Sequence, residues 1–348
     1  MSYKSLTTLF MLACLLTTSL FAKPQIALLA TGGTIAGAGK SSTASQYSAA
    51  IVPVTQLIQN VPEISAIADI HGEQVVQLAS QAMSPDVWLR IAKDAQAALE
   101  KDTIAGVVIT HGTDTMEETA YFLQLTLQTQ KPVVLVGSMR PGTALGADGA
   151  ANLYQAVKTV ITPDSHRRGV MVLMNDTLFS ARDVTKSHPF VPSAFAAPNT
   201  GPIGHFQNDG PTYLSRPERL APSPFDLKTL ATLPGVAIVY GYAGSSAAQI
   251  RGAVAEGVRG IVIAGVGNGN LHPDTEKSLI AARQDGIVIV RSSRVGSGSV
   301  TKGAEVDDLK HGFIVAGSLN PQKARVLLIL ALTQTVDLER IQGYFDTL

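Results

Sequence analysis

Cysteine is almost absent from this chain of 348 residues, which contains only Cys14. A single cysteine cannot form a disulfide within the chain, and it excludes zinc sites and redox motifs that need two or more thiols. Cys14 also lies inside an N-terminal apolar segment that has the features of a cleaved signal. We therefore expect the mature protein to carry neither a disulfide nor a reactive thiol.

An excess of charge is absent as well. Lys+Arg and Asp+Glu are equal at 27 each, and charged residues make up 16% of the chain. Proteins that bind nucleic acid or anionic membranes usually carry a basic excess, so we expect neither partner. The 7 histidines show no metal-ligand spacing such as H-E-x-x-H, and we expect no metal site.

A long hydrophobic run occurs only at the N-terminus. After Lys4 and Ser5 the chain continues as "LTTLFMLACLLTTSLFA" and reaches Ala22. A basic residue followed by a short apolar run is typical of a secretory signal peptide, and a membrane-spanning helix usually needs about 20 apolar residues. The sequence therefore predicts a signal peptide at residues 1–22, cleavage after Ala22, a periplasmic location and no membrane attachment after cleavage.

Beyond the signal, short β-branched runs alternate with helical patterns. The predicted strands are "QIALLA", "GVVIT", "PVVLVG", "GVMVLM", "GVAIVY", "GIVIAG" and "GIVIVR". Runs that are apolar on both faces are typical of buried parallel strands, and their alternation with helices predicts an α/β fold. The helices have clear beginnings at Ser84-Pro85, near Met116 and at Pro273-Asp274.

The α/β pattern is interrupted once, between about Phe195 and Pro234, by a segment rich in Pro, Gly and Asn. Such a composition is typical of a connection between domains. We predict an N-terminal domain at residues 23–212 with a larger, mainly parallel sheet flanked by helices. A linker at 213–234 and a smaller C-terminal parallel α/β domain at 235–348 complete the chain.

A glycine-rich segment, "ATGGTIAGAGKS" at residues 30–41, follows the first predicted strand. Its end, Gly39-Lys40-Ser41, resembles a P-loop, but that motif requires a glycine where this chain has Thr34. The dinucleotide fingerprint G-x-G-x-x-G is not formed either. The segment therefore does not predict a phosphate site, and Thr34 becomes a candidate nucleophile.

Ligands of open α/β sheets bind beyond the carboxyl ends of the strands, so the residues after each strand are the candidate site. Two sets of groups occur there: Thr34 with Tyr47, and Thr113 with Asp114 and Lys186. A threonine hydroxyl becomes nucleophilic when a neighbouring group removes its proton and a further group orients that base. Either set has the chemistry for covalent catalysis.

Structural interpretations of the same residues remain open at this stage. A threonine after a strand is often a turn or cap residue, and Asp114 could simply begin the helix that has Glu117 and Glu118 in its first turn. His111 lies beside Thr113, yet we interpret it as a hydrogen-bonded core histidine rather than a member of a triad.

Several long motifs resemble those of the bacterial L-asparaginase family. The segments "LLATGGTIAG" and "GVVITHGTDTMEETAYF" resemble its two signatures, and "KPVVLVGSMRP", "MNDT", "RDVTK", "IAGVGNGN", "VIVRSSRV", "AEVDD" and "GSLNPQKARVLL" resemble further family segments in the same order. The resemblance extends from about Pro24 to the C-terminus. Together with the signal peptide, it indicates the exported, type II branch.

The resemblance implies an amidohydrolase that converts L-asparagine to L-aspartate and ammonia without a metal or cofactor. Thr34 matches the nucleophile on a loop that closes over the substrate with Tyr47, and Thr113, Asp114 and Lys186 match the second hydroxyl–amine set. Ser80 and Gln81 match positions that hold the α-carboxylate and α-amino groups. Glu305 matches a carboxylate donated by a neighbouring subunit, in homotetramers built as dimers of dimers.

Gly244 departs from the family pattern, which often has Asn or Asp there to support the α-amino group of the substrate. Ser245 or Ser246 could take this role instead. The preference for asparagine over glutamine is therefore open, and a dual glutaminase–asparaginase is the second enzyme hypothesis. A periplasmic amino-acid-binding protein is the alternative from another class, although simple binding does not require the Thr34 and Thr113 sets.

Overall fold

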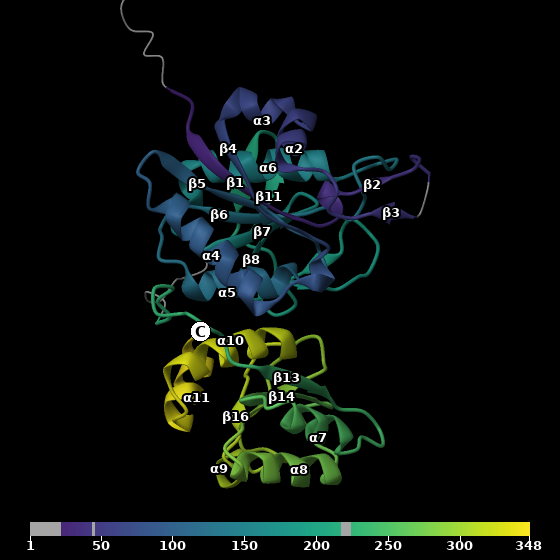
Figure 1. The fold of residues 1–348 in the computed structure, drawn as a ribbon, viewed down its shortest axis with the longest axis vertical. Coiled ribbons are helices and arrows are strands. Elements are labelled where there is room, and N and C mark those ends of the chain that lie inside the picture. Colours follow the sequence, from purple (N-terminus) through teal and green to yellow (C-terminus); the bar gives the residue numbers. More distant parts are fainter. Residues whose placement is uncertain (1–21, 44–45, 217–223) are drawn as a thin grey trace, which may run out of the picture.

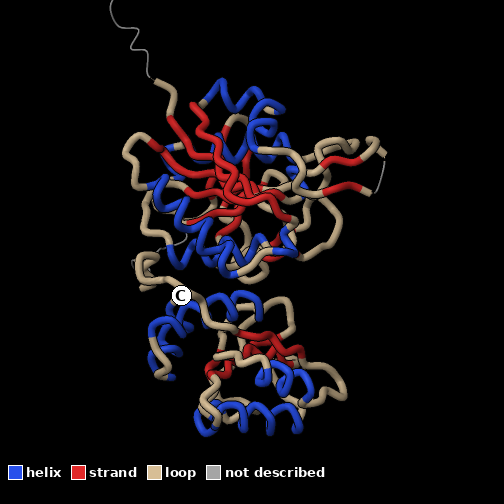
Figure 2. The backbone as a smooth tube through the Cα atoms, viewed as in Figure 1, coloured by secondary structure: helices blue, strands red, loops and turns tan. Residues whose placement is uncertain are grey.

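Two sheets of different size organise the chain, one on either side of the segment 214–235 (Figures 1 and 2). The computed structural model describes residues 22–43, 46–216 and 224–348. The larger sheet has eight strands in the order β12-β11-β8-β7-β6-β5-β1-β4. Its parallel strands are β1 (Gln25–Gly32), β4 (Asp69–Leu78), β5 (Ile104–Thr110), β6 (Val133–Val136) and β7 (Val170–Met174). Its antiparallel extension is β8 (Thr177–Ser180), β11 (Gly204–Gln207) and β12 (Gly210–Tyr213).

Helices cover both faces of the larger sheet, which is why its central strands are apolar on both sides. In β1, Ala27 and Leu29 point into one core, whereas Ile26 and Leu28 point into the other. The first core is covered by α4 (Pro85–Leu99) and α5 (Met116–Thr126). The second is covered by α2 (Val54–Asn60), α3 (Pro62–Ile67) and α6 (Gly149–Ile161), which is followed by the short η3 (Pro163–Ser165).

The smaller sheet is wholly parallel, with its strands side by side in chain order. It consists of β13 (Val236–Tyr240), β14 (Gly260–Gly265), β15 (Val288–Ser293) and β16 (Ile314–Val315). One face packs on α7 (Ala248–Ala255) and α8 (Pro273–Gln284), and α9 (Asp308–His311) precedes β16. The other face packs on α10 (Pro321–Gln334), which α11 (Leu338–Thr347) follows and contacts.

Helix α10 lies between the two sheets (Figure 1). It contacts α5 of the larger domain as well as β13 and β14 of the smaller one. Its buried residues include Leu327, Leu328 and Leu330, which lie on different sides of the helix. A helix that is apolar on every side is buried on every side, and α10 accordingly joins the core of one domain to that of the other.

The α/β fold with a larger, mainly parallel N-terminal sheet and a smaller parallel C-terminal sheet is confirmed. All seven predicted strands are present, and helices begin at Pro85, Met116 and Pro273 as expected. Ser84 caps α4 by accepting a hydrogen bond from the backbone N–H of Val87. The N-cap residue of α5 is Thr115, so the structural alternative in which Asp114 begins this helix does not hold. The sequence patterns also missed β4, β8, β11, β12 and β16.

Most of the predicted signal peptide lies outside the described residues. Within the part of the chain that the structure describes, no helix has both the length and the apolar content needed to cross a membrane. The predicted linker, 213–234, begins at the last residue of β12 and ends before β13, and residues 217–223 of it are likewise not described.

Three neighbouring parallel strands place the candidate site. β4, β1 and β5 lie side by side, so their carboxyl ends meet at one edge of the sheet. They lead into η2 (Ser80–Ala82), η1 (Thr34–Ala36) and the loop 111–115. A hairpin of β2 (Ala38–Gly39) and β3 (Tyr47–Ser48) extends away from this edge (Figure 1). A second small hairpin is formed by β9 (Thr185–Lys186) and β10 (Phe195–Ala196).

Candidate active site

Thr34 is the first residue of η1, directly after β1. Its side chain is almost fully buried, at 9% exposure, and its Oγ1 lies 2.9 Å from the phenol oxygen of Tyr47. Tyr47 is 39% exposed and reaches back from the projecting hairpin. The structure therefore brings together the hydroxyl and the phenol that the sequence paired across thirteen residues.

The glycines before Thr34 allow two loops to touch. Gly33 has φ +79°, and a Cβ on it would lie 2.3 Å from the Cα of Gly112. No side chain fits in that space, so both the conformation and the close approach require glycine. Gly33 precedes Thr34 and Gly112 precedes Thr113, so the contact places the two candidate hydroxyl residues next to each other at one sheet edge.

Thr113 is 5% exposed and has an amine as its partner. Lys186 Nζ donates a hydrogen bond to Thr113 Oγ1 over 2.9 Å and forms an ion pair with Asp114 Oδ1 over 2.6 Å. The lysine side chain is 16% exposed, whereas that of Asp114 is 56% exposed. The carboxylate thus fixes the ammonium group from the solvent side while leaving part of its own surface open to a ligand.

Ser80 links the neighbouring strand end to the same loop. It is 4% exposed, and its Oγ accepts a hydrogen bond from the backbone N–H of Asp114 over 3.2 Å. Thr115 Oγ1 donates to the carbonyl oxygen of Ser80 over 2.8 Å. Gln81, the next residue, is exposed, and its side chain has no hydrogen-bond partner in the described part of the protein.

Glu305 is apart from this cluster in the single chain. It is an exposed residue of the loop between β15 and α9, and within the described residues its side chain forms neither a hydrogen bond nor an ion pair.

Gly244 has φ +76° with open space around its Cβ position. Ser245 is 6% exposed, and its hydroxyl donates to the carbonyl oxygen of Tyr242 over 2.5 Å. Because this hydroxyl is bound within a local turn, it is not free to support the α-amino group of a substrate as the family's Asn or Asp does.

His111 is a hydrogen-bonded core histidine, as expected. It is fully buried, with Nδ1 2.7 Å from the carbonyl oxygen of Gly112 and Nε2 2.9 Å from Thr119 Oγ1. Because a carbonyl only accepts, Nδ1 carries the hydrogen and Nε2 of the neutral ring accepts from Thr119. Burial lowers the pKa of His111 to about 4, although the hydrogen bond to Gly112 partly opposes this shift. His111 therefore stabilises the loop before Thr113 as a neutral ring.

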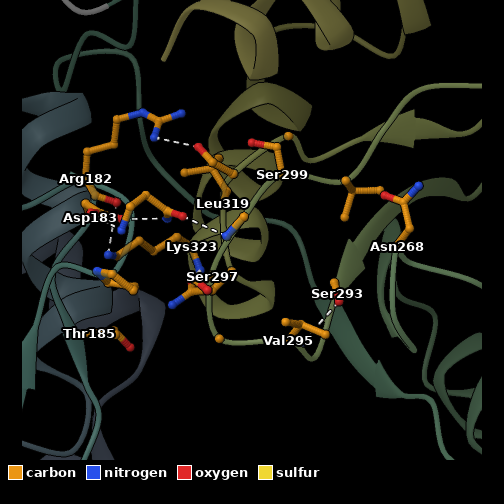
Figure 3. A pocket seen from close by; sticks show the side chains of 18 of the residues that line it. Arg182, Asp183, Thr185, Asn268, Ser293, Val295, Ser297, Ser299, Leu319 and Lys323 are labelled. Atoms are coloured by element: carbon orange, nitrogen blue, oxygen red, sulfur yellow. Dashed lines mark hydrogen bonds between the residues drawn. The ribbon is translucent and has the colours of Figure 1, made fainter.

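A cavity of about 320 Å³ lies between the domains (Figure 3). Its lining includes Arg182, Asp183 and Lys323, but none of the predicted site residues. Within the described residues, moreover, no group of three or more His, Cys, Asp or Glu side chains could hold a metal ion.

Family models match both domains of this chain. The family described as "Asparaginase, N-terminal" matches residues 25–219, and the "Glutaminase/Asparaginase C-terminal domain" matches residues 235–345. This chain belongs to the asparaginase family.

Relatives of this asparaginase-family chain cover nearly its whole length. It is 50% identical over 327 residues to L-asparaginase 2 of Escherichia coli strain K12, a match that covers 93% of both chains. A "Probable L-asparaginase periplasmic" of Haemophilus influenzae is 49% identical over 325 residues, again with 93% of both chains covered. A crystal structure of a probable cytoplasmic L-asparaginase from Campylobacter jejuni superimposes with a TM-score of 0.90 at 44% identity, covering 94% of this chain and all of that one.

Two features of this asparaginase-family site were not predicted from the sequence. One is the contact between Gly33 and Gly112, and the other is the pair of hydrogen bonds that join Ser80 to residues 114 and 115. A signal for the first was present, because a glycine directly precedes the candidate threonine after each of two strands. Nothing local signals the second, since Ser80 lies more than thirty residues from its partners.

Proposed function

We propose that this chain is an L-asparaginase, an amidohydrolase that converts L-asparagine and water to L-aspartate and ammonia without a cofactor. One observation carries the proposal: each of two hydroxyls on touching loops has its own proton-transfer partner, Thr34 with Tyr47 and Thr113 with Lys186. Membership of the asparaginase family supports the same reaction class.

In the first half-reaction, Thr34 Oγ1 attacks the carbon of the substrate's side-chain amide. A C–O bond forms, the hydroxyl proton passes to the phenol oxygen of Tyr47 while the phenol gives up its own proton towards the amide nitrogen, and negative charge develops on the amide oxygen. Donors directed at such an oxygen commonly lower the barrier by about 3 kcal/mol. The C–N bond then breaks, and the nitrogen takes up the proton and leaves as ammonia. Thr34 is left as a β-aspartyl ester.

In the second half-reaction, a water molecule attacks this ester. The water gives a proton to Thr113 Oγ1, and Thr113 passes its own proton to Lys186 Nζ, which accepts it as the neutral amine. Asp114 stabilises the ammonium group so formed through its 2.6 Å contact with the lysine. The bond between the acyl carbon and Thr34 Oγ1 breaks, and the threonine oxygen takes up a proton. Thr113 also has a base partner, so it is the alternative nucleophile. We favour Thr34 because it matches the nucleophile of the family that the sequence resembles and because Tyr47 reaches its hydroxyl from the projecting hairpin.

Recognition of the substrate follows from its charges. A zwitterionic amino acid needs carboxylates for its ammonium group and hydrogen-bond donors for its carboxylate. Asp114, with its exposed carboxylate, supplies part of the first set with the Gln81 amide beside it, and the Ser80 hydroxyl contributes to the second. We propose that Glu305 completes the ammonium site from a neighbouring subunit of a homotetramer, because in its own chain it is exposed and has no described partner.

A dual glutaminase–asparaginase is the second candidate. The C-terminal family is described as covering both activities, and Gly244 leaves an open position where family members often carry a polar side chain. One methylene distinguishes the two substrates, a difference that is commonly worth about 1–3 kcal/mol.

We place the enzyme in the periplasm, on the basis of the predicted signal and the relative that is named periplasmic.

Ammonia release by the purified protein tests the proposal. We expect turnover of L-asparagine, and the ratio of kcat/KM for asparagine to that for glutamine decides between the two enzyme hypotheses. If neither amide releases ammonia while calorimetry detects amino-acid binding, the binding-protein hypothesis replaces both.

A further inference from the structure

Lys323 is a buried lysine that the proposed reaction does not use. It lies in the first turns of α10, is 2% exposed, and so carries its ammonium group into the space between the domains. Its Nζ donates to the carbonyl oxygen of Arg182 over 3.0 Å and also to the carbonyl oxygen of Val184. Figure 3 shows Lys323 beside Arg182 and Asp183 at the interdomain cavity.

The two carbonyl groups belong to the segment that carries Lys186. This segment leaves β8 at Ser180 and enters β9 at Thr185, one residue before Lys186. Val184 is fully buried, so its carbonyl oxygen depends on a protein donor. Lys323 therefore binds a carbonyl group that lies only two residues before Lys186 in the chain, although the two lysines belong to different domains.

Other contacts tie the same segment to the C-terminal domain. Arg182 donates through Nε to the carbonyl oxygen of Leu348 and through Nη1 to Ser318 Oγ, over 2.9 and 3.0 Å. Asp183 accepts hydrogen bonds from Asn199, whose side-chain oxygen in turn accepts from the backbone N–H of Gly298. The position of Lys186 in the larger domain therefore depends on contacts with the smaller domain.

Lys323 does more than fill space, because burying its charged group costs free energy that an apolar side chain would not. Burial lowers the pKa of this lysine to about 8, while the nearby carboxylates of Glu117 and Asp183 oppose the shift and Arg182 adds to it. An apolar side chain would fill the same space without desolvating an ammonium group, but it could not donate to two carbonyl groups. The hydrogen bonds to residues 182 and 184 are what a lysine specifically provides here.

We propose that Lys323 is a positioning residue for catalysis: it fixes the backbone of residues 182–184 so that Lys186 stays within hydrogen-bond distance of Thr113. This inference rests on the proposed function, in which Lys186 takes part in the chemistry. A displacement of about 1 Å in a reacting group can lower a rate by a factor of about 100, so the hold on this segment is expected to affect kcat.

A double-mutant cycle separates positioning from general stability. Lys323→Met keeps an unbranched side chain, one atom shorter than lysine, but removes its donors, and we expect kcat for ammonia release to fall about tenfold or more with little change in KM. In a Lys186→Met background the same substitution should leave the residual rate unchanged, because no lysine remains to be positioned. Lys277→Met, at an exposed position of α8, is the matched control and should keep the wild-type kcat.

A second variant, Lys323→Gln, tests the same role should Lys323→Met fail to fold. Lys323→Gln keeps a polar head that ends one atom short of the lysine ammonium, and it should lower kcat in the same Lys186-dependent way. Lys323→Arg retains donors and charge and should recover part of the lost kcat. Thermal unfolding and oligomer size are measured for every variant, so that rates refer to folded protein.

The outcomes are distinct. A folded Lys323→Met or Lys323→Gln protein with wild-type kcat would overturn the positioning role. An equal proportional loss in the Lys186→Met background would overturn it too, because that result indicates a structural effect independent of Lys186. Full activity of Lys186→Met alone would show that Lys186 takes no part in the chemistry, and the positioning role of Lys323 would be overturned with it. If the wild-type protein releases no ammonia from either amide, the proposed function itself fails.

Discussion

Gly112 lies directly against Ser80: a Cβ on Gly112 would be 2.6 Å from the Ser80 Oγ and 2.7 Å from its Cβ. This contact lets the Ser80 Oγ reach the backbone N–H of Asp114. Two loops that carry different parts of the candidate site are thus fitted to each other at a position where even a methyl group is excluded.

The first prediction concerns this fit. Gly112→Ala should lower kcat/KM for asparagine by a factor of about 100, because the added methyl group forces the Ser80 and Thr113 loops apart. Gly252→Ala is the control, since that glycine lies inside α7 with open space at its Cβ position. It should leave activity unchanged and raise the free energy of unfolding by about 0.5–1 kcal/mol. Normal kinetics in a folded Gly112→Ala protein would show that the fit is not required.

The identity of the nucleophile is the second prediction. Thr34→Val and Thr113→Val each keep the β-branched shape and remove one hydroxyl, and both should lose most of kcat because the groups act as a unit. After rapid acid quenching, mass spectrometry of peptides from the wild-type enzyme should locate the acyl ester on Thr34. An ester on the peptide that contains Thr113 would reverse the assignment of the two threonines.

A shared site between subunits gives the third prediction. Thr34→Ala and Glu305→Gln homo-oligomers should both be inactive, yet refolding equal amounts together should restore activity. A mixed two-fold dimer has one site with both native residues and one site with both substitutions. Random mixing makes about half of the dimers mixed, so recovery should reach roughly a quarter of the wild-type activity. Activity no higher than the sum of the two mutants, in verified mixed dimers, would exclude a role for Glu305 across the interface.

The fourth prediction tests the open position at Gly244. Asn tolerates a positive φ better than most residues, and a Cβ at this glycine meets no atom within 4 Å. Gly244→Asn should therefore fold normally and increase the ratio of kcat/KM for asparagine over glutamine. Gly257→Asn is matched to it, with φ +75° and equally open surroundings at the end of α7. An identical ratio in both variants and the wild type would show that position 244 does not contribute to specificity.

The fifth prediction is a dependence of stability on pH. The pKa of His111 is lowered from 6.5 to about 4 in the folded state, so the unfolded chain binds a proton that the folded chain does not. The stability associated with neutral His111 is complete above pH 6.5 and is lost as the pH falls from 6.5 towards 4. The loss amounts to about 3 kcal/mol.

Denaturant unfolding between pH 4 and 7 measures this contribution. His111→Gln should remove that part of the slope, whereas His166→Gln, at an exposed position, should retain it. Equal slopes in all three proteins would mean that His111 is not the group responsible.

The central strands could be predicted because burial on both faces leaves a clear sequence pattern, as in Val133–Val136. The edge strand β4 could not, because Asp69–Leu78 is largely polar and is held chiefly by backbone pairing with β1. β8 was not predicted for another reason: it follows Asn175 and Asp176, two residues with positive φ that form the turn after β7. These two polar residues end the apolar run of β7 and reverse the chain into β8.

The candidate site was predictable only in part, for a related reason. Thr34 and Thr113 follow buried strands directly, so the rule about strand ends locates them. Ser80 and Glu305 follow no predicted strand and were assigned through the family resemblance alone. The role of Lys323 could not be predicted from the sequence, because its acceptors are backbone carbonyl groups. Every residue has such a group, so the types of residues 182 and 184 give no indication of the contact.

The burial of α10 between both sheets has a thermodynamic consequence. Its apolar side chains belong to a core that also contains Phe122 of the larger domain and Val262 of the smaller one. Neither domain can open this core without exposing apolar surface of the other, so the two should melt in a single cooperative transition. Calorimetric and van't Hoff enthalpies should then agree for the chain as a whole, despite its two sheets.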